Sequence, residues 1–241
     1  MAIAVFADIH GNLEALQAIL KSIKRKGIKQ VYFLGDAITF GPDSLECLKL
    51  LAKSGVRCII GNHEQRMLRY DKSVAEMSFE GTKHMEDIRA SLDNEALAFI
   101  KSLPLEIKTE YKGYKIAFTH YSHDKSGVVR DDYEEFSEPK LIKLFDYLGS
   151  DIVFFGHIHH RKIIIDASNK SFMCLGSSGC VHGDKTFWTY FDIKKSPDSD
   201  ANLDFRRIMC KFNRKKFEKK VKESELANNE KFAKKFFNVD I

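Results

Sequence analysis

The stretch AIAVFADIHGNLEALQAIL, Ala2 to Leu20, sets the pattern for the whole chain. An apolar run of the strand type ends in Asp8 and His10, and a segment follows in which leucines and isoleucines recur every three or four residues. That spacing is typical of an amphipathic helix, and Gly27 marks its end. The stretch therefore predicts a buried strand, a polar strand end and a helix, in that order.

The same alternation continues up to residue 64. QVYFLGD (30–36) is a second run of the buried-strand type, Ser44–Lys53 has the pattern of a helix, and VRCIIGNHE (56–64) is a third strand. Strands that alternate with helices predict crossover units on a sheet. We therefore expect an α/β (α+β) fold.

The rest of the chain turns from helix to strand. Residues 64–103 are rich in Glu, Lys, Leu and Ala and predict a small helical cap inserted after the third strand. From Pro104 onward short β-type runs predominate, interrupted by a helix over Pro139–Leu148. A basic C-terminal helix is expected over about 213–237. We find no repeat and no linker, so we predict a single domain, 1–241.

Composition favours a globular, cytoplasmic protein. Hydrophobic residues make up 44% and charged residues 30% of the 241 residues, which is ordinary for a soluble domain with a sizeable core. The apolar runs are too short to cross a bilayer, and the N-terminus lacks the basic region of a signal peptide, so no membrane partner is expected. Five scattered cysteines without a CxxC pair indicate free thiols in a reducing cytoplasm.

The net charge of +5 is concentrated after Arg206. A basic tail can bind nucleic acid or anionic lipid, but a solvated helix face has the same composition. We favour a structural tail that packs onto the domain through Phe217, Val221, Leu226 and Phe232. Nucleic acid as a partner stays open.

Polar residues follow the ends of five predicted strands. In α/β proteins such strand ends meet at one rim, where ligands bind. The residues concerned are Asp8, His10, Asp36, Asn62, His63, Glu64, His120, His157 and His159. Each alone is a weak signal, because a histidine or an aspartate after a strand is usually structural. Their ordered recurrence beside glycines predicts a metal or catalytic site.

This ordered set resembles the calcineurin-like metallophosphoesterase superfamily. The motifs that carry the resemblance are ADIHGN (7–12), LGDAITFGPD (34–43), GNHE (61–64), His120 and GHIH (156–159). They span roughly the first two thirds of the chain and look closest to a bacterial and archaeal branch of small phosphoesterases. The resemblance implies a four-layer β-sandwich of two mixed sheets flanked by helices. It also implies hydrolysis of a small phosphodiester or phosphomonoester.

The resemblance further implies a centre of two divalent metal ions. Asp36 would bridge the ions, Asp8, His10 and His159 would complete the shell of one, and Asn62, His120 and His157 would complete that of the other. Ions about 3.5–4 Å apart can clamp a phosphate and activate a bridging hydroxide as the nucleophile. Nitrogen and oxygen ligands suit Mn²⁺, which we expect first, and also Fe, Zn, Co or Ni. The lack of cysteine ligands disfavours a structural thiolate zinc site.

His63 is expected to be catalytic rather than a ligand. It directly follows Asn62, so its side chain should point away from the metal that Asn62 holds, and in the family the matching histidine faces the substrate. We expect it to protonate the leaving alkoxide or to stabilise the phosphoryl oxygens. Glu64 either orients a neighbouring ligand or is a carboxylate at a helix N-terminus. Strand alternation in FFGHIHH (154–160) puts His160 outside the site.

Departures from the family pattern concern the substrate. GDAITFG (35–41) lacks the arginine of the protein phosphatases and of the symmetrical dinucleoside tetraphosphatases, so neither activity is expected. Tyr121-Ser122-His123 and Cys174–Ser177 replace sequences that are usual in the closer branch, so specificity is expected to differ. Candidate phosphate contacts, each with packing as the simpler role, are His123, Arg130, Arg66, His84 and His182.

Two alternatives come from other functional classes. One is a non-catalytic scaffold of the same fold, which the intact ligand positions and the presence of His63 argue against. The other is a nucleic-acid phosphodiesterase that uses the basic tail as an electrostatic arm. The sequence leaves the physiological substrate, the native metal and the oligomeric state open.

Overall fold

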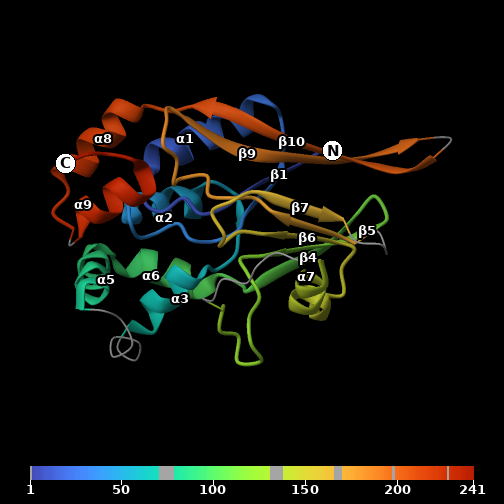
Figure 1. Ribbon diagram of the computed structural model, residues 1–241, viewed down its shortest axis with the longest axis horizontal. Coiled ribbons are helices and arrows are strands. Elements are labelled where there is room, and N and C mark those ends of the chain that lie inside the picture. The colour runs from blue at the N-terminus through green and yellow to red at the C-terminus, as the bar shows by residue number, and fades with distance from the viewer. Residues whose placement is uncertain (1, 71–78, 131–137, 166–169, 197–198, 227) are drawn as a thin grey trace.

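The computed structural model describes residues 2–70, 79–130, 138–165, 170–196, 199–226 and 228–241. Two five-stranded sheets lie face to face, and helices cover their outer surfaces (Figure 1). Both sheets contain parallel and antiparallel strand pairs. The expected α/β sandwich of two mixed sheets is therefore confirmed.

The first sheet is built around the N-terminal crossover units. Its strands, in the order β10-β9-β1-β2-β3, are β1 (Ile3–Phe6), β2 (Gln30–Phe33), β3 (Arg57–Cys58), β9 (Lys185–Ser196) and β10 (Ser199–Lys211). The three N-terminal strands are parallel and are joined by α1 (Leu13–Arg25) and α2 (Ser44–Lys53). The alternation predicted for the first sixty residues is thus present. β9 and β10 form a long antiparallel hairpin that extends past the rest of the sheet (Figure 1).

The second sheet has a parallel centre and antiparallel edges. Its strands, in the order β4-β5-β6-β8-β7, are β4 (Glu106–Tyr111), β5 (Tyr114–Thr119), β6 (Ile152–Phe155), β7 (Lys162–Ile165) and β8 (Ser171–Cys174). The helix α7 (Glu138–Phe145) and the 3₁₀ turn η2 (Asp146–Leu148) pack on its outer face, where Phe145 and Leu148 are buried. The helix expected over 139–148 corresponds to these two elements.

The period-two pattern of the strands divides the core into layers. In β1, Ile3 and Val5 point between the two sheets, whereas Ala4 and Phe6 point toward the helices. Between the sheets the rings of Tyr32 and Phe118 stack with their centroids 3.8 Å apart. Apolar contact on both faces fixes the register of the central strands, and with it the positions of the polar residues at their ends.

Between the third strand and residue 103, the described residues form three helices. They are α3 (Asn62–Leu68), α5 (Phe79–Ser91) and α6 (Asn94–Ser102), within the segment for which a helical cap over about 64–103 is predicted. The Asp93 side chain accepts a hydrogen bond from the amide of Ala96 and caps α6. Met85, Ile88 and Ile100 pack into the same core cluster as α1 and α2. The segment therefore lies against the first sheet's helical layer (Figure 1).

The C-terminal segment differs from the single helix expected over about 213–237. It forms α8 (Arg214–Glu223), α9 (Asn229–Phe232) and a π-helical turn, η3 (Ala233–Phe237). The helix stops at Ser224, whose backbone is extended, because the Asn229 side chain donates to the carbonyls of Val221 and Ser224. Phe217 and Val221 of α8 are buried. Among the described residues, no helix combines the length and apolar character needed to span a membrane.

Candidate metal centre

The loops after the strands hold several residues in the left-handed backbone region. Asp8, His10, Asp36 and His157 have φ values of 55°, 48°, 59° and 66°. This conformation is uncommon for residues other than glycine and costs about 1–3 kcal/mol each, so it concentrates where function fixes a side chain. All four are predicted ligands.

Glycines let these loops approach one another. A Cβ atom on Gly61 would lie 2.1 Å from Oδ1 of Asp36, and one on Gly35 would lie 2.6 Å from the backbone nitrogen of Gly61. Only glycine leaves room for this contact between the second and third motif loops. The contact brings the Asp36 carboxylate beside the start of α3.

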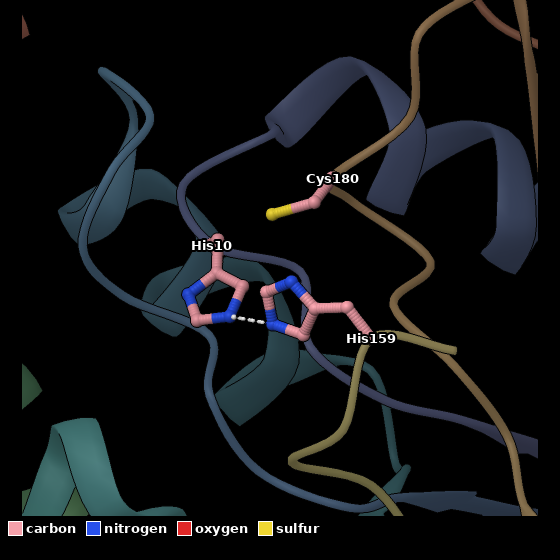
Figure 2. A group of neighbouring side chains, drawn as sticks. All are labelled: His10, His159 and Cys180. Atoms are coloured by element: carbon pink, nitrogen blue, oxygen red, sulfur yellow. Dashed lines mark hydrogen bonds between the residues drawn. The ribbon is translucent and has the colours of Figure 1, made fainter. Parts of the chain in front are cut away.

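One group of donors gathers around His10. Nε2 of His10 and Nε2 of His159 face each other at 3.1 Å (Figure 2). Nδ1 of His10 lies 3.1 Å from the carbonyl oxygen of Ile38, so Nδ1 carries the hydrogen and Nε2 presents its lone pair. Oδ2 of Asp36 lies 3.9 Å from Nε2 of His10.

A second group shares Asp36. Nε2 of His120 lies 3.2 Å from Oδ2 of Asp36 and 2.9 Å from Oδ1 of Asn62. Nδ1 of His157 lies 3.2 Å from the same Asn62 oxygen. Nδ1 of His120 donates to the carbonyl of Leu34 at 2.6 Å, which again leaves Nε2 for a ligand. Asp36 is thus the residue common to both groups, as the bridging role requires.

Asp8 supplies a further oxygen at the rim. Its Oδ1 accepts from the amide of His157 at 3.2 Å, whereas its Oδ2 is buried and has no hydrogen-bond partner among the described residues. Burial raises the pKa of Asp8 well above its usual range. A buried carboxylate oxygen without a donor is stabilised by a cation. This oxygen and the facing imidazole nitrogens fit divalent metal ions of the type that bind mixed nitrogen and oxygen donors.

Burial also controls the imidazole pKa values. It lowers the pKa of His10 to about 3 and that of His63 to about 4, and the Asp36 carboxylate opposes this only in part. Burial lowers the pKa of His159 to about 3 as well. All three are therefore neutral at neutral pH, and for the predicted ligands His10 and His159 this is the form that binds metal.

His120 and Asp36 behave as a pair. Burial lowers the pKa of His120, but the Asp36 carboxylate more than offsets this and raises it to about 10. Burial raises the pKa of Asp36, but the neighbouring histidines, His120 foremost, bring it well below its usual range. At this nitrogen a proton and a metal ion compete for the same lone pair, so metal binding should release a proton.

Glu64 links two of the loops. Its carboxylate oxygens accept hydrogen bonds from the amides of Asp36 at 2.9 Å, Ala37 at 2.7 Å and Gly61 at 2.9 Å. Of the two roles considered for Glu64, this contact set matches the one that orients a ligand, because it fixes the backbone that carries Asp36. Glu64 also lies in the first turn of α3, so its position is compatible with the second predicted role, that of a carboxylate at a helix N-terminus.

The predicted catalytic histidine faces the same centre. Nε2 of His63 lies 3.9 Å from Oδ2 of Asp36, and the His63 and His10 rings meet edge to face at 5.1 Å. His63 remains partly accessible, with 13% of its side chain exposed, whereas His10 is fully buried. His160 is exposed and belongs to neither group.

The candidate phosphate contacts lie in different places. His123 and Arg130 line a surface cavity of about 670 Å³ together with Lys125, Lys140 and Lys143, and none of the predicted metal ligands lines it. His182 is exposed and Arg66 is half-buried. His84 is buried and accepts a hydrogen bond from the amide of Phe40 at 3.2 Å, so its role in the structure is packing and support.

Aromatic side chains border the centre, and the sequence predicts no role for them there. Phe40, within the second motif, stacks on Phe236 with centroids 3.9 Å apart and lies 4.6 Å from the His10 ring. Phe236 also meets the His159 ring at 5.9 Å, and Phe232 meets Phe40 at 5.2 Å. The C-terminal segment therefore forms one wall of the centre; the sequence predicted that this tail packs onto the domain but not that it borders the metal centre.

Comparison with known proteins identifies a family that this chain matches. Residues 1–161 match the family described as calcineurin-like phosphoesterase. An uncharacterised protein of Methanocaldococcus jannaschii is 30% identical over 230 residues, covering 80% of this chain and 89% of that protein. A symmetrical bis(5'-nucleosyl)-tetraphosphatase of Actinobacillus succinogenes is 25% identical over 121 residues, covering 48% of this chain and 43% of the enzyme. The chain thus matches less than half the length of that tetraphosphatase.

The fold has solved counterparts. The crystal structure of a metallophosphoesterase from Sphaerobacter thermophilus superposes with a TM-score of 0.66 and 19% identity, covering 94% of this chain and 95% of that chain. At this level of identity the likeness concerns the fold alone.

Proposed function

The chain belongs to the calcineurin-like phosphoesterase family, and from this premise we propose that it hydrolyses a small phosphodiester or phosphomonoester at a centre of two divalent metal ions. Its class is that of a phosphoric ester hydrolase. The observation that carries the proposal is the convergence of two donor groups on Asp36, with His120 on one side and His10 on the other.

The proposed ligands are those expected from the motifs. Asp8, His10, His159 and Asp36 would hold one ion, and Asn62, His120, His157 and Asp36 the other. Bound there, two ions would supply an activated water as the nucleophile and would neutralise the phosphoryl oxygens. Mn²⁺ is our first candidate, with Fe, Zn, Co or Ni as alternatives, because the donors are nitrogen and oxygen.

His63 is the proposed proton donor. Its Nε2 faces the rim. Burial, opposed in part by the Asp36 carboxylate, lowers the pKa of His63 to about 4, so Nε2 carries a proton only in the imidazolium form, which a bound phosphate ester would stabilise by its negative charge. A developing alkoxide within reach of Nε2 would take a proton from it, and a phosphoryl oxygen would accept a hydrogen bond. The partly open position of this ring supports contact with substrate.

The central experiment is an assay with chromogenic esters. Purified protein incubated with Mn²⁺ should hydrolyse a nitrophenyl phosphodiester or monoester, and EDTA should abolish the reaction. A metal-loaded, folded sample that is inert to both esters would contradict the proposal. A panel of phosphomonoesters, cyclic nucleotides and dinucleoside polyphosphates with each metal would then define the substrate. Dinucleoside polyphosphates belong in it because of the partial match to a tetraphosphatase.

A role in nucleic-acid hydrolysis is the second candidate, because the tail is basic. Part of that positive charge is paired within the protein, since Lys220 forms ion pairs with Glu14 and Asp43, each at 2.9 Å. Removing the whole chain after Arg206 would cut into β10, so it would test folding instead. Substituting the exposed Lys215, Lys219 and Lys222 with glutamine leaves the packing intact.

A salt series of gel shifts on this triple variant separates the two roles. An electrostatic arm predicts that binding of oligonucleotides by the unsubstituted protein falls steeply with salt and is weakened in the variant. A structural tail predicts no binding in either. The burial of Phe217 and Val221 favours the structural tail.

A further inference from the structure

The motifs contain no cysteine, yet the fold brings one to the centre. The sulfur of Cys180 lies with ring nitrogens of His10 and His159, all three atoms within 4.8 Å of one another. Figure 2 shows the thiol projecting from its loop toward the space beside the two facing rings. A sulfur atom is thus placed next to donors that the motifs alone predict to be only nitrogen and oxygen.

The loop that carries Cys180 is fixed to the backbone of the first motif. The amides of Ser178 and Gly179 donate to the carbonyls of Ala7 and Asp8, each at 2.9 Å. The Ser177 hydroxyl donates to the same Asp8 carbonyl at 2.8 Å and accepts from the amide of Cys180 at 2.9 Å. Cys180 is therefore held in place relative to Asp8 and the residues that follow it.

Close packing supports this placement. A Cβ atom on Gly179 would lie 1.8 Å from the carbonyl oxygen of Ile9, so the loop touches the first motif directly. The Asn12 side chain adds a hydrogen bond to the carbonyl of Gly179 at 2.9 Å. A position fixed by this many backbone contacts can present a side chain to a ligand without a large cost in conformational entropy.

Two independent features call for a cation at Asp8, whose backbone the Cys180 loop contacts, and at the facing rings of His10 and His159. Oδ2 of Asp8 is buried without a partner among the described residues, and Nε2 of His10 and Nε2 of His159 face each other at 3.1 Å. A metal ion between these groups would have the sulfur beside it.

We propose that Cys180 is an additional ligand of the metal ion held by His10 and His159. The inference rests on the metal centre of the proposed function. On binding, the thiol proton leaves to solvent and the sulfur lone pair forms the bond to the ion, so no electron is transferred. A thiolate is a soft donor, so this position selects Zn²⁺ or Fe²⁺ over Mn²⁺. The position at Asn62 and His120, with only nitrogen and oxygen donors, has no such bias.

Cobalt substitution tests the sulfur bond without relying on activity. Co²⁺ bound by a thiolate shows a sulfur-to-cobalt charge-transfer band in the near ultraviolet. We expect this band in the unsubstituted protein and in Cys210→Ser, whose thiol lies on β10 and is also half-buried. We expect its loss in Cys180→Ser. A band that persists in Cys180→Ser would overturn the inference.

Alkylation of the unsubstituted protein gives a second readout if the Cys180 variant fails to fold. Bound Zn²⁺ should slow the reaction of Cys180 with iodoacetamide and leave Cys210, the internal reference, unaffected. Equal rates with and without zinc at Cys180 would overturn the inference.

The two proposals fail in different ways. Protein that binds two equivalents of Co²⁺ and hydrolyses esters, but shows no charge-transfer band, refutes the sulfur ligand and leaves the phosphoesterase intact. Protein that binds no Co²⁺ refutes both. A competition between Zn²⁺ and Mn²⁺ adds a quantitative result, because Cys180→Ser should lose at least about 10-fold in zinc affinity while manganese affinity changes less.

Discussion

The Thr39 hydroxyl oxygen lies 2.8 Å from Nδ1 of His63 and 2.5 Å from the carbonyl oxygen of Ile38. Because the hydroxyl donates its hydrogen to that carbonyl, it accepts from Nδ1–H of His63. With Nδ1–H held by Thr39, Nε2 is the nitrogen directed at the centre, 3.9 Å from Oδ2 of Asp36, and in the imidazolium form it carries the proton to be donated. Thr39 is therefore a positioning residue for the proposed proton donor.

Replacing His63 with alanine should reduce the rate and keep the metal. General acid catalysis contributes about 100- to 10,000-fold, so kcat should fall within that range. Steady-state kinetics and elemental analysis of the same preparation check the two halves of this expectation. Metal-free His63→Ala would mean that His63 is a ligand and that the assignment is incorrect.

Replacing Thr39 with valine should act through His63. The loss of the acceptor frees the ring to rotate and to change tautomer, so kcat should fall by about 10- to 100-fold with little change in KM. Thr189→Val is a matched control, since Thr189 is also buried and its hydroxyl has no partner among the described residues. Equal kinetics for both variants would refute the positioning role.

Removing metal should destabilise the protein more as pH rises. Burial, with a smaller contribution from Asp36, raises the pKa of Glu64 to about 7, and burial raises that of Asp8. A carboxyl group with a raised folded-state pKa stabilises the fold when protonated, so this contribution is present at low pH and is lost as pH rises toward about 7. Bound cations stabilise the ionised carboxylates instead.

Thermal melting with Mn²⁺ and with EDTA measures this effect. The gap in Tm between the two samples should be wider at about pH 8 than at about pH 5, because the ionisation of Glu64, with a pKa of about 7, falls between these values. A gap that stays constant or narrows as pH rises would show that these buried carboxyl groups do not face bound cations.

Replacing Phe236 with alanine should affect both stability and substrate binding. Its ring stacks on Phe40 and borders His159, so the variant removes part of the wall of the centre. The free energy of unfolding should fall by about 1 kcal/mol or more from the lost ring pair and its buried area. Kinetics with a nitrophenyl ester should show a changed KM.

A control for this wall variant comes from β10. Phe205 is also half-buried and stacks on Phe191 with centroids 4.9 Å apart, away from the predicted ligands. Phe205→Ala should lower stability similarly and leave KM unchanged. If both variants changed only stability, the C-terminal wall would have no part in substrate binding.

Much of the fold follows from local patterns in the sequence. The continuous apolar run of β1 and the helical spacing after Asn12 depend on near neighbours, so the crossover units could be predicted. The predicted ligands come together because parallel strands end at one rim. The order of the motifs resembles that of a known family, and this resemblance predicted the same set of ligands.

Other features depend on contacts between distant segments. Cys180 reaches the centre because Gly179 packs against Ile9, and no local pattern near residue 180 indicates this. Phe236 stacks on Phe40, nearly two hundred residues earlier in the chain. The break after Ser224 depends on one side-chain cap from Asn229, which outweighs the helical composition around it.

The most direct test of the two-metal centre is to count metal ions and measure hydrolysis in the same samples of unsubstituted protein, Asp36→Asn and Asp204→Asn. Asp204 pairs with Lys194 and Arg206 on the β9–β10 hairpin and serves as the control carboxylate. A bridging Asp36 predicts two bound ions and ester hydrolysis in the unsubstituted protein and in Asp204→Asn, with both properties lost in Asp36→Asn. Full activity or full metal content in folded Asp36→Asn would contradict it.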